Sequence, residues 1–433
     1  MMNLSIQSYK GTRDLYPEDM RLRQYIFNAW ERVSERFGYE KYDAPILEPI
    51  EIYAAKSGEE IVNDQTYSFT DRGDRKVAIR PEMTPSIARM VAARRQELPL
   101  PARLSSIANF MRYERPQKGR EREFWQLNVD IFGVASVKAD IEAITMADQI
   151  LREFGASSEM YTILVGDRRL TDFLMGEYFG LWGQGAAQMV KLFDRRAKIT
   201  PDEFEKQARD ILNENVPEYT SETWTKIKEI TEVKSLDDLP SSVLEKAPID
   251  DLKELIAALA ARGITNAKYD PTLMRGFDYY TGIVFEVFDN NPDNNRAMFG
   301  GGRYDGLVGL FGVEDLPVVG FAPGETTTVE FLRAWNLVPE IQPATKIVIV
   351  PIGEVDTGGV ADELRALGIN VSVDFTGRKL DKVIKSAAKT GVPYLLFVGE
   401  DELASGQYTL KNISTETEQK LTLGQVIDTV AKL

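Results

Sequence analysis

The sequence of 433 residues contains no cysteine and no histidine. Without these two residue types there is no disulfide, no His/Cys zinc site, no Ser-His-Asp triad and no imidazole acid–base catalysis. Carboxylate, Arg, Lys, Tyr and hydroxyl groups remain. Enzymes built from such groups work by positioning substrates and stabilising charge, as Arg and Mg²⁺ do around phosphates. The two absences therefore favour nucleotide chemistry.

Long apolar runs are absent as well. No segment approaches the roughly 18 consecutive apolar residues of a membrane-spanning helix, and the first residues lack the apolar stretch of a secretion signal. The net charge of −15 disfavours a protein that coats nucleic acid through an overall positive field, but it leaves a local basic groove possible. We therefore expect a soluble, cytoplasmic protein, with two or three domains at this length.

The first half of the chain alternates between helix and strand patterns. Leu22, Ile26, Trp30 and Val33 recur at helical spacing, which predicts an amphipathic helix over residues 17–37.

Strand patterns follow this helix. Residues 41–49 contain two prolines and suit an edge strand, and residues 66–81 predict two strands around a turn. Thr84, followed by Pro85, is predicted to be the N-cap of a helix. Residues 106–133 predict a long antiparallel hairpin with a charged loop.

The distribution of helix and strand patterns predicts an N-terminal domain that is interrupted by a helical insertion, followed by a separate C-terminal domain. We expect residues 1–168 and 263–335 to form one catalytic domain, with an acidic helical insertion at 169–262. A linker at 336–343 leads to residues 344–433, where strands alternate with helices and predict a mostly parallel α/β domain.

Four segments have residues suited to ligand binding, and each also has a plain structural interpretation. The hairpin loop gathers cations next to Phe124, which suits phosphate and base binding, although a solvated charged loop has the same composition. Residues 275–282 and 300–306 combine polar side chains with glycines that allow close backbone approach, but strand turns use the same residues. The carboxylate and hydroxyl of residues 80–84 suit an ammonium group, or a helix start.

Taken in order, these segments resemble the histidyl-tRNA synthetase family over nearly the whole chain. The segments are KGTRDLYP, FGYEKYDAPILEP, RPEMT, the ERPQKGR hairpin loop, RGFDYYTGIVFE and GGRYDGLVG. The resemblance implies an α+β catalytic domain with a class II antiparallel sheet flanked by helices, a helical insertion that leans toward the acceptor arm, and a C-terminal α/β anticodon-binding domain. It implies a homodimer formed partly through residues 37–49. The implied reaction is ATP-dependent activation of L-histidine to histidyl-adenylate and its transfer to the 3′ end of tRNA(His).

The resemblance also implies roles for individual residues. The histidine pocket would contain Glu82, Met83, Thr84, Gln126, Asp130, Tyr279 and Tyr280. Within it, Glu82, Thr84 and Gln126 would hold the α-ammonium group, and Asp130 and Tyr280 would face the imidazole. Asp130 stands where many relatives have glutamate.

For ATP, the resemblance implies that Arg112 grips the α-phosphate, Phe124 stacks on adenine and Arg120 reaches the outer phosphates. Arg275 would bind the reacting carboxylate and the α-phosphate from the opposite side, so Arg112 and Arg275 are the implied catalytic residues. Mg²⁺ would bridge the ATP phosphates without an assigned protein ligand. Arg115 and Gln117 would contact the acceptor end of the tRNA.

One departure from the family pattern bears on activity. The family usually has Gly-Leu-Glu-Arg at the start of a helix, and that arginine clasps the nucleotide; here Thr327 stands in its place. Either another arginine such as Arg303 or Arg333 supplies the charge, or ATP binding is weakened. The second possibility keeps two alternatives open: a regulatory subunit of ATP phosphoribosyltransferase, and a tRNA-binding sensor.

A basic helix face is expected in the C-terminal domain. Lys379, Lys382, Lys385 and Lys389 recur every three or four residues. They suit binding to an anticodon stem, and equally a solvated helix face.

Overall fold

The structure is a computed structural model that describes residues 5–54, 65–115, 117, 119–196, 199–216, 218, 221–273, 279–294 and 296–431. The chain divides into two compact units, Met1–Val338 and Pro339–Leu433. Among the helices in the described ranges, none has the length and apolarity needed to cross a membrane.

A large sheet of eight strands organises the first unit, in the order β1-β5-β6-β11-β10-β9-β7-β8. The strands are β1 Glu40–Lys41, β5 Ala102–Met111, β6 Glu123–Phe132, β7 Tyr161–Asp167, β8 Ala267–Tyr269, β9 Ile283–Asp289, β10 Ala297–Arg303 and β11 Val318–Phe321. Only the two edge pairs, β1–β5 and β7–β8, are parallel; the five pairs between them are antiparallel. The expected antiparallel sheet is thus confirmed.

The hairpin of β5 and β6 lies within this sheet and is in register over its whole length, from Ala102 opposite Phe132 to Met111 opposite Glu123. This confirms the hairpin predicted for residues 106–133. Its loop carries the charged residues, so the sheet holds them at one end of two long paired strands.

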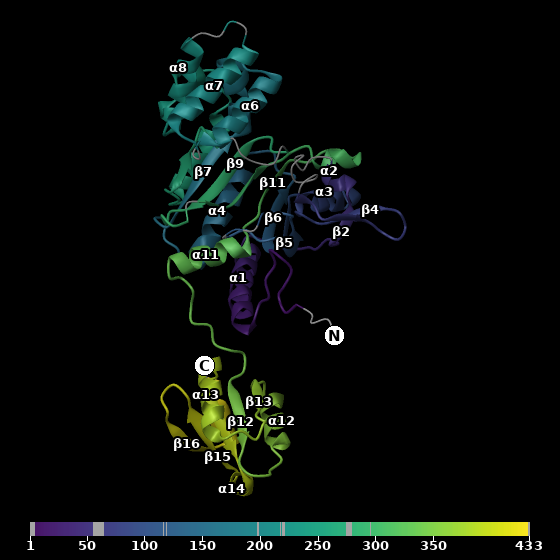
Figure 1. Cartoon of the computed structure of the whole chain (residues 1–433), viewed down its shortest axis with the longest axis vertical. Coiled ribbons are helices and arrows are strands. Elements are labelled where there is room, and N and C mark those ends of the chain that lie inside the picture. Colours follow the sequence, from purple (N-terminus) through teal and green to yellow (C-terminus); the bar gives the residue numbers. More distant parts are fainter. Residues whose placement is uncertain are drawn as a thin grey trace. The chain divides into compact units, whose positions relative to one another are not determined.

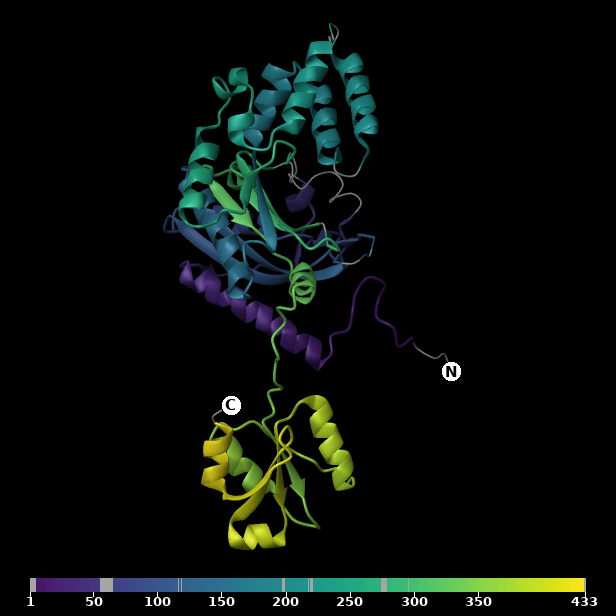
Figure 2. The same ribbon diagram turned by 90° about the vertical axis from the view of Figure 1, so that its left-hand side faces the viewer.

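Several helices pack against the large sheet (Figures 1 and 2). The predicted first helix is α1, Pro17–Arg36, and it buries Leu22, Ile26, Trp30 and Val33 as their spacing requires. It contacts α4 (Lys138–Glu153) and α11 (Glu325–Ala334). The chain leaves α1 through Gly38, whose φ of +75° favours glycine.

A small sheet β2-β4-β3 adjoins α2 (Glu51–Ala54) and α3 (Thr84–Ala93). The strands are β2 Leu47–Pro49, β3 Ser68–Thr70 and β4 Lys76–Ile79. The pair predicted in residues 66–81 is therefore confirmed. The prediction that Thr84 is the N-cap is wrong, because Met83 already has helical backbone angles and occupies the cap position, and Thr84 is the first helical residue.

Helices dominate between β7 and β8. They are α5 Arg168–Phe173, the π-helical turn η2 Leu174–Tyr178, α6 Gly183–Asp194, α7 Pro201–Asn215, α8 Ser221–Glu232, the 3-10 turn η4 Leu236–Asp238, α9 Ser241–Leu244 and α10 Asp250–Ala261. Helices α6, α7 and α8 lie side by side beyond one end of the large sheet (Figures 1 and 2). A second 3-10 turn, η5 Val308–Phe311, follows β10.

The second unit is a five-stranded sheet in the order β13-β12-β14-β15-β16. Its elements are β12 Ile347–Pro351, α12 Gly358–Ala366, β13 Val371–Val373, α13 Leu380–Thr390, β14 Tyr394–Val398, α14 Glu400–Ser405, β15 Gln407–Asn412, β16 Glu418–Thr422 and α15 Leu423–Val430. The α/β prediction is confirmed, but the sheet is not mostly parallel: two strand pairs are parallel and two are antiparallel. The pattern missed β16 because this edge strand is polar and largely exposed, as edge strands often are.

Candidate active site

A cavity of about 1030 Å³ opens on the large sheet of the first unit. Strand β6 contributes Trp125 to its wall, together with four residues at every second position: Phe124, Gln126, Asn128 and Asp130. These residues alternate along the strand, and alternate residues of a strand face the same side of a sheet. The other walls come from β9, β10, β11, the hairpin loop and α6.

Most of the residues singled out in the sequence meet in this cavity. They are Glu82, Thr84, Arg112, Arg120, Phe124, Gln126, Asp130, Tyr279 and Tyr280. Met83 does not line the cavity, because its side chain is fully buried among Ala44, Ala108 and Phe110. Arg115 and Gln117 are exposed on the hairpin loop, outside the cavity wall. Arg275 lies outside the described residues.

One end of the cavity, the Asp130 end, consists of Asp130, Tyr304, Glu82, Tyr279 and Tyr280. The Tyr304 hydroxyl donates a hydrogen bond to Asp130 Oδ1, and the Tyr279 hydroxyl donates to Glu82 Oε2 over 3.2 Å. The three tyrosine rings pack with centroids 5.1 to 6.4 Å apart. These polar groups are buried and held by one another, so their positions are set before a ligand arrives.

The electrostatics of the Asp130 end follow from burial. Burial raises the pKa of Asp130 from 3.8 to about 7, against the opposing hydrogen bond from Tyr304. Burial likewise raises the pKa of Tyr279, and the nearby Glu82 carboxylate adds to the shift. Asp130 is thus a carboxyl group that changes charge near neutral pH.

Glycines make room for the Asp130 carboxyl group. A Cβ atom on Gly320 would lie 2.2 Å from Asp130 Oδ1, and one on Gly301 would lie 2.3 Å from the Gly320 carbonyl oxygen. Both distances are impossible for real side chains, so the sheet tolerates only glycine at these positions. Residues 300–302 lie within β10, so they are not a hairpin corner, and Gly300 and Gly301 line the cavity.

The other end of the cavity, the Arg112 end, consists of Arg112, Glu114, Arg120, Phe124 and Thr327. Arg112 Nε donates to the Pro81 carbonyl oxygen over 2.8 Å, and its Cζ lies 5.2 Å from the centroid of the Phe124 ring. Arg120 is more than half exposed, and its Nη1 lies 3.4 Å from Glu114 Oε2. This end combines an arginine held by the backbone and a ring with a more exposed cation, an arrangement suited to a nucleotide.

Thr327 lines the Arg112 end but directs its polar atom at the backbone. Its hydroxyl oxygen lies 2.9 Å from the Met298 carbonyl oxygen and 3.1 Å from that of Gly324. Its neighbour Glu325 is buried and paired with Arg13, with 2.7 Å between Nη2 and Oε2. The start of α11 therefore adds no positive side chain to the cavity.

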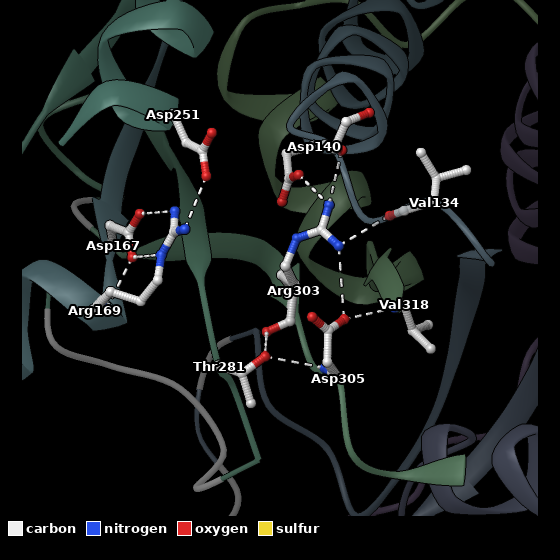
Figure 3. A network of polar contacts seen from close by, with 10 residues as sticks. Val134, Asp140, Asp167, Arg169, Asp251, Thr281, Arg303, Asp305 and Val318 are labelled. Atoms are coloured by element: carbon white, nitrogen blue, oxygen red, sulfur yellow. Dashed lines mark hydrogen bonds and ion pairs between the residues drawn. The ribbon is translucent and has the colours of Figure 1, made fainter. Parts of the chain in front are cut away.

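Arg303 and Arg333 were the candidates to supply the charge that is missing at Thr327, and neither lines the cavity. Arg303 is buried and binds the carbonyl oxygen of Val134 at 3.0 Å and Asp140 Oδ2 at 2.5 Å. Figure 3 shows its guanidinium between Asp140 and Asp305. Arg333 lies on α11 with its Nη1 3.9 Å from Glu330. The expectation that one of them supplies the charge is therefore not met in this structure.

Several cavity residues received no individual role from the sequence, although Tyr304 lies in the candidate segment 300–306. They are Asn128, Tyr304, Glu286, Arg168, Lys191 and Arg195. Asn128 lies between Gln126 and Asp130 in the alternating pattern of β6, so the strand period could have identified it. Lys191 lies on α6 and Arg195 is the C-cap residue of that helix, and no sequence pattern indicated that this helix lines the cavity.

The antiparallel sheet, the cavity with an acidic and a basic end, and the separate α/β unit define the class of protein. This combination is that of a class II aminoacyl-tRNA synthetase. Comparison with known families then specifies which one: residues 11–324 match the histidyl-tRNA synthetase family, and residues 346–433 match the anticodon binding domain family. The chain belongs to the histidyl-tRNA synthetase family.

Curated relatives match along the full chain. The histidine–tRNA ligase of Leptospira biflexa is 39% identical over 433 residues, covering 99% of this chain and 98% of the relative. That of Thermococcus kodakarensis is 35% identical, covering 99% of both chains.

Solved structures share the fold at lower identity. The crystal structure of histidyl-tRNA synthetase from Nostoc sp. has a TM-score of 0.82 at 20% identity and covers 99% of this chain and 100% of that chain. A Bacillus halodurans structure titled as an ATP phosphoribosyltransferase regulatory subunit/histidyl-tRNA synthetase has a TM-score of 0.73 at 21% identity, covering 92% and 99%. These likenesses report the fold, and they do not favour the regulatory alternative over the ligase.

Proposed function

We propose that the Asp130 end of the cavity holds histidine and that the Arg112 end holds ATP, so that the two react between them. Ligation of histidine to tRNA is the function that the family and its full-length relatives give to this chain. The roles of individual residues are our proposal. The observation that supports them is that the buried Asp130–Tyr304 pair faces the same cavity as Arg112 and Phe124.

The Asp130 end suits an imidazole because it offers an acceptor in a fixed place. A neutral imidazole has one N–H donor and one acceptor nitrogen. Ionised Asp130 would accept the N–H, and the Tyr280 hydroxyl would donate to the second nitrogen. An apolar side chain of similar size would leave the buried Asp130 carboxylate without a hydrogen-bond partner on the ligand. The site would therefore discriminate strongly against such an amino acid.

Glu82, Thr84 and Gln126 also line the cavity, and their polar groups suit the α-ammonium group of the amino acid. Tyr279 donates to Glu82 Oε2, which fixes that carboxylate. The reacting carboxylate of histidine would then point toward the Arg112 end.

Adenylate formation joins the two ends. A carboxylate oxygen of histidine attacks the α-phosphorus of ATP, the bond to the β-phosphate oxygen breaks, and pyrophosphate leaves with that electron pair. Arg112 stabilises charge on the α-phosphoryl oxygens while Phe124 stacks on adenine, and Arg120 reaches the outer phosphates. Arg275, outside the described residues, is proposed for the opposite side of the α-phosphate.

Mg²⁺ is proposed to accompany ATP, where it would neutralise part of the phosphate charge. Within the described ranges, no group of three or more acidic side chains is placed to hold a metal ion. The phosphates would therefore supply most of its ligands.

The exposed hairpin loop and the second unit are proposed to contact tRNA. Arg115 and Gln117 lie on the loop beside the cavity and suit the acceptor end, whose terminal ribose hydroxyl receives the histidyl group. In the second unit, four lysines at the start of and along α13 are exposed: Lys379, Lys382, Lys385 and Lys389. Neutralising these four lysines is expected to lower the salt dependence of tRNA binding.

An exposed aromatic ring stands next to this basic face. Phe375 is 85% exposed, in a turn fixed by Asp374, which accepts from the Thr376 amide at 2.8 Å and from Arg378 Nη2 at 2.9 Å. Burial opposes the ionised form, but these hydrogen bonds outweigh it and lower the pKa of Asp374. An exposed ring next to cations suits stacking on an unpaired base. We therefore propose that Phe375 stacks on a base of the anticodon loop of the tRNA.

Two further features stay proposals. Ile46 and Leu47 are exposed apolar residues within residues 37–49, the segment assigned to a homodimer interface. Sedimentation of the native protein, compared with an Ile46→Glu variant, tests this interface. A cytoplasmic location is proposed from the sequence alone.

The test of the proposed function is histidine-dependent exchange of pyrophosphate into ATP by the purified native protein, beside Arg112→Ala and Arg275→Ala variants. We expect exchange by the native protein and its loss in both variants, because each removes charge stabilisation at the α-phosphate. Absence of exchange from folded native protein would refute the proposal. Binding to ATP phosphoribosyltransferase or to tRNA would then separate the regulatory and sensor alternatives.

A further inference from the structure

The loss of the usual arginine at position 327 leaves the outer phosphates of ATP short of one cation. Thr327 cannot replace it, because its hydroxyl is uncharged and faces two backbone carbonyl oxygens. Arg303 and Arg333 are held elsewhere. Arg13 and Arg23 lie near α11, but both face the buried carboxylate of Glu325, at 2.7 and 3.8 Å, and neither lines the cavity.

One face of α6 forms part of the cavity wall. Ala187, Val190, Lys191 and Asp194 line the cavity, as does Arg195, the C-cap residue of α6. They are spaced three and four residues apart, which places them on one side of a helix. The helical segment between β7 and β8 therefore contributes one continuous face to the cavity that contains Arg112 and Phe124.

The opposite side of α6 is packed, which fixes the direction of this face. Gly185, Met189, Leu192 and Phe193 are buried. The ring centroid of Phe193 lies 5.5 Å from that of Phe204 on α7. A Cβ atom on Gly185 would lie 2.7 Å from the Cβ of Asn215, so α6 and α7 approach as closely as glycine permits.

Lys191 differs from the other described cations of the cavity wall. Arg112 and Arg120 face Glu114, Arg168 pairs with Asp172 at 3.3 Å, and Arg195 Nη2 donates to Gln207 at 3.0 Å. Lys191 is exposed and lines the cavity, and it has no ion pair or hydrogen bond with any described residue. A lysine ammonium is a point charge on a flexible four-carbon stem, which suits a phosphate group that moves as it leaves.

We propose that Lys191 binds the outer phosphates of ATP and the departing pyrophosphate, and so supplies the charge that Thr327 lacks. This inference rests on the proposed function. Lys191 forms no covalent bond. It stabilises negative charge on the β- and γ-phosphoryl oxygens while the bond between the α-phosphorus and the bridging oxygen breaks. The helical segment then takes part in amino acid activation itself, before any tRNA is bound.

The test compares Lys191→Ala and Lys191→Arg with Lys206→Ala, an exposed lysine on α7 that does not line the cavity. The assay is histidine-dependent pyrophosphate exchange without tRNA, with ATP and histidine varied separately. Lys191→Ala is expected to lower kcat/KM for ATP about tenfold, the effect of losing one charged phosphate contact, with the KM for histidine unchanged. Lys191→Arg should retain most of the activity, and Lys206→Ala all of it.

Unchanged ATP kinetics in Lys191→Ala would overturn the inference. So would an unchanged exchange rate together with a raised KM for tRNA in aminoacylation, since this result assigns the α6 face to the acceptor end of tRNA. Equal losses in Lys191→Ala and Lys206→Ala would also count against it, because they would point to a general weakening of the helical segment. Absence of exchange from the native protein is a different result, and it refutes the proposed function.

Discussion

The two ends of the cavity are built differently. At the Asp130 end, buried polar groups hold one another: Tyr304 donates to Asp130, and Tyr279 donates to Glu82. At the Arg112 end, charged groups are more exposed and face carboxylates that a ligand must compete with, as Arg120 faces Glu114 at 3.4 Å.

The difference matches what each end has to recognise. An imidazole is small and is distinguished by two nitrogen atoms, so the groups that read it must be fixed before it binds. Phosphates are large charges that move during the reaction, and flexible cations can follow them. A position such as Thr327 can therefore change if another cation reaches the same phosphates, whereas Asp130 has no described neighbour in the cavity that could replace its carboxylate next to Tyr304.

The largest effect is expected from Asp130→Asn. The substitution keeps the shape but removes the negative acceptor that faces the imidazole, so kcat/KM for histidine should fall roughly 10³-fold. The KM for ATP should stay within a few-fold of the native value, measured by pyrophosphate exchange. A larger loss for ATP than for histidine would contradict the assignment of Asp130 to the amino acid end.

Arg303→Met tests the claim that Arg303 stabilises the fold and does not serve the Arg112 end. It leaves Asp140 buried without its partner, which should lower the free energy of unfolding of the first unit by about 3–5 kcal/mol. All five tryptophans precede residue 338, so urea unfolding followed by tryptophan fluorescence reports this unit.

The double variant Arg303→Met/Asp140→Leu is the matched control. It should recover much of the lost stability, because no buried charge remains unpaired. The folded fraction of Arg303→Met should keep the native KM for ATP. A raised KM in folded protein would place Arg303 among the nucleotide-binding residues.

The third prediction concerns pH. Because the pKa of Asp130 is raised to about 7, the carboxyl group of the unliganded cavity is protonated below that pH and ionised above it. Ionised Asp130 accepts the imidazole N–H, so kcat/KM for histidine should fall about tenfold between pH 8 and pH 6, since kcat/KM reports the free enzyme.

Histidine itself titrates in this range, so the control substrate is 1,2,4-triazole-3-alanine, whose ring stays neutral. A fall with the same apparent pKa for this substrate assigns the titration to the protein, and Asp130→Asn should abolish it. A flat profile with the triazole substrate would show that the substrate alone titrates.

The sequence predicted elements whose pattern is local. Leu22, Ile26, Trp30 and Val33 marked α1 because a helix repeats every 3.6 residues, and the two long strands marked the hairpin. Phe124, Gln126 and Asp130 were assigned through the family resemblance, and their alternation along β6 explains why they meet.

Features that depend on distant partners could not be predicted. Tyr304 and Asp130 are 174 residues apart, and Arg303 and Asp140 are 163 apart. Nothing in the local pattern of Arg303 shows that Val134 and Asp140 surround it, so its charge appeared available for ATP. The face of α6 is visible as a helical pattern, but only the packing of Gly185 and Phe193 shows that this face turns toward the cavity.

The smallest effect is expected outside both ends of the cavity, at Phe375. Phe375→Ala removes an exposed ring from the turn next to the basic face of α13, which should raise the KM for tRNA in aminoacylation about fivefold, the lower range for loss of one stacked base. Pyrophosphate exchange should be unchanged, because adenylate formation does not involve the anticodon. Leu367→Ala is the control, since Leu367 is also exposed, at 57%, but lies at the end of α12. Equal effects of the two variants on the KM for tRNA would contradict a specific stacking role for Phe375. A changed rate of pyrophosphate exchange would contradict its assignment to tRNA binding alone.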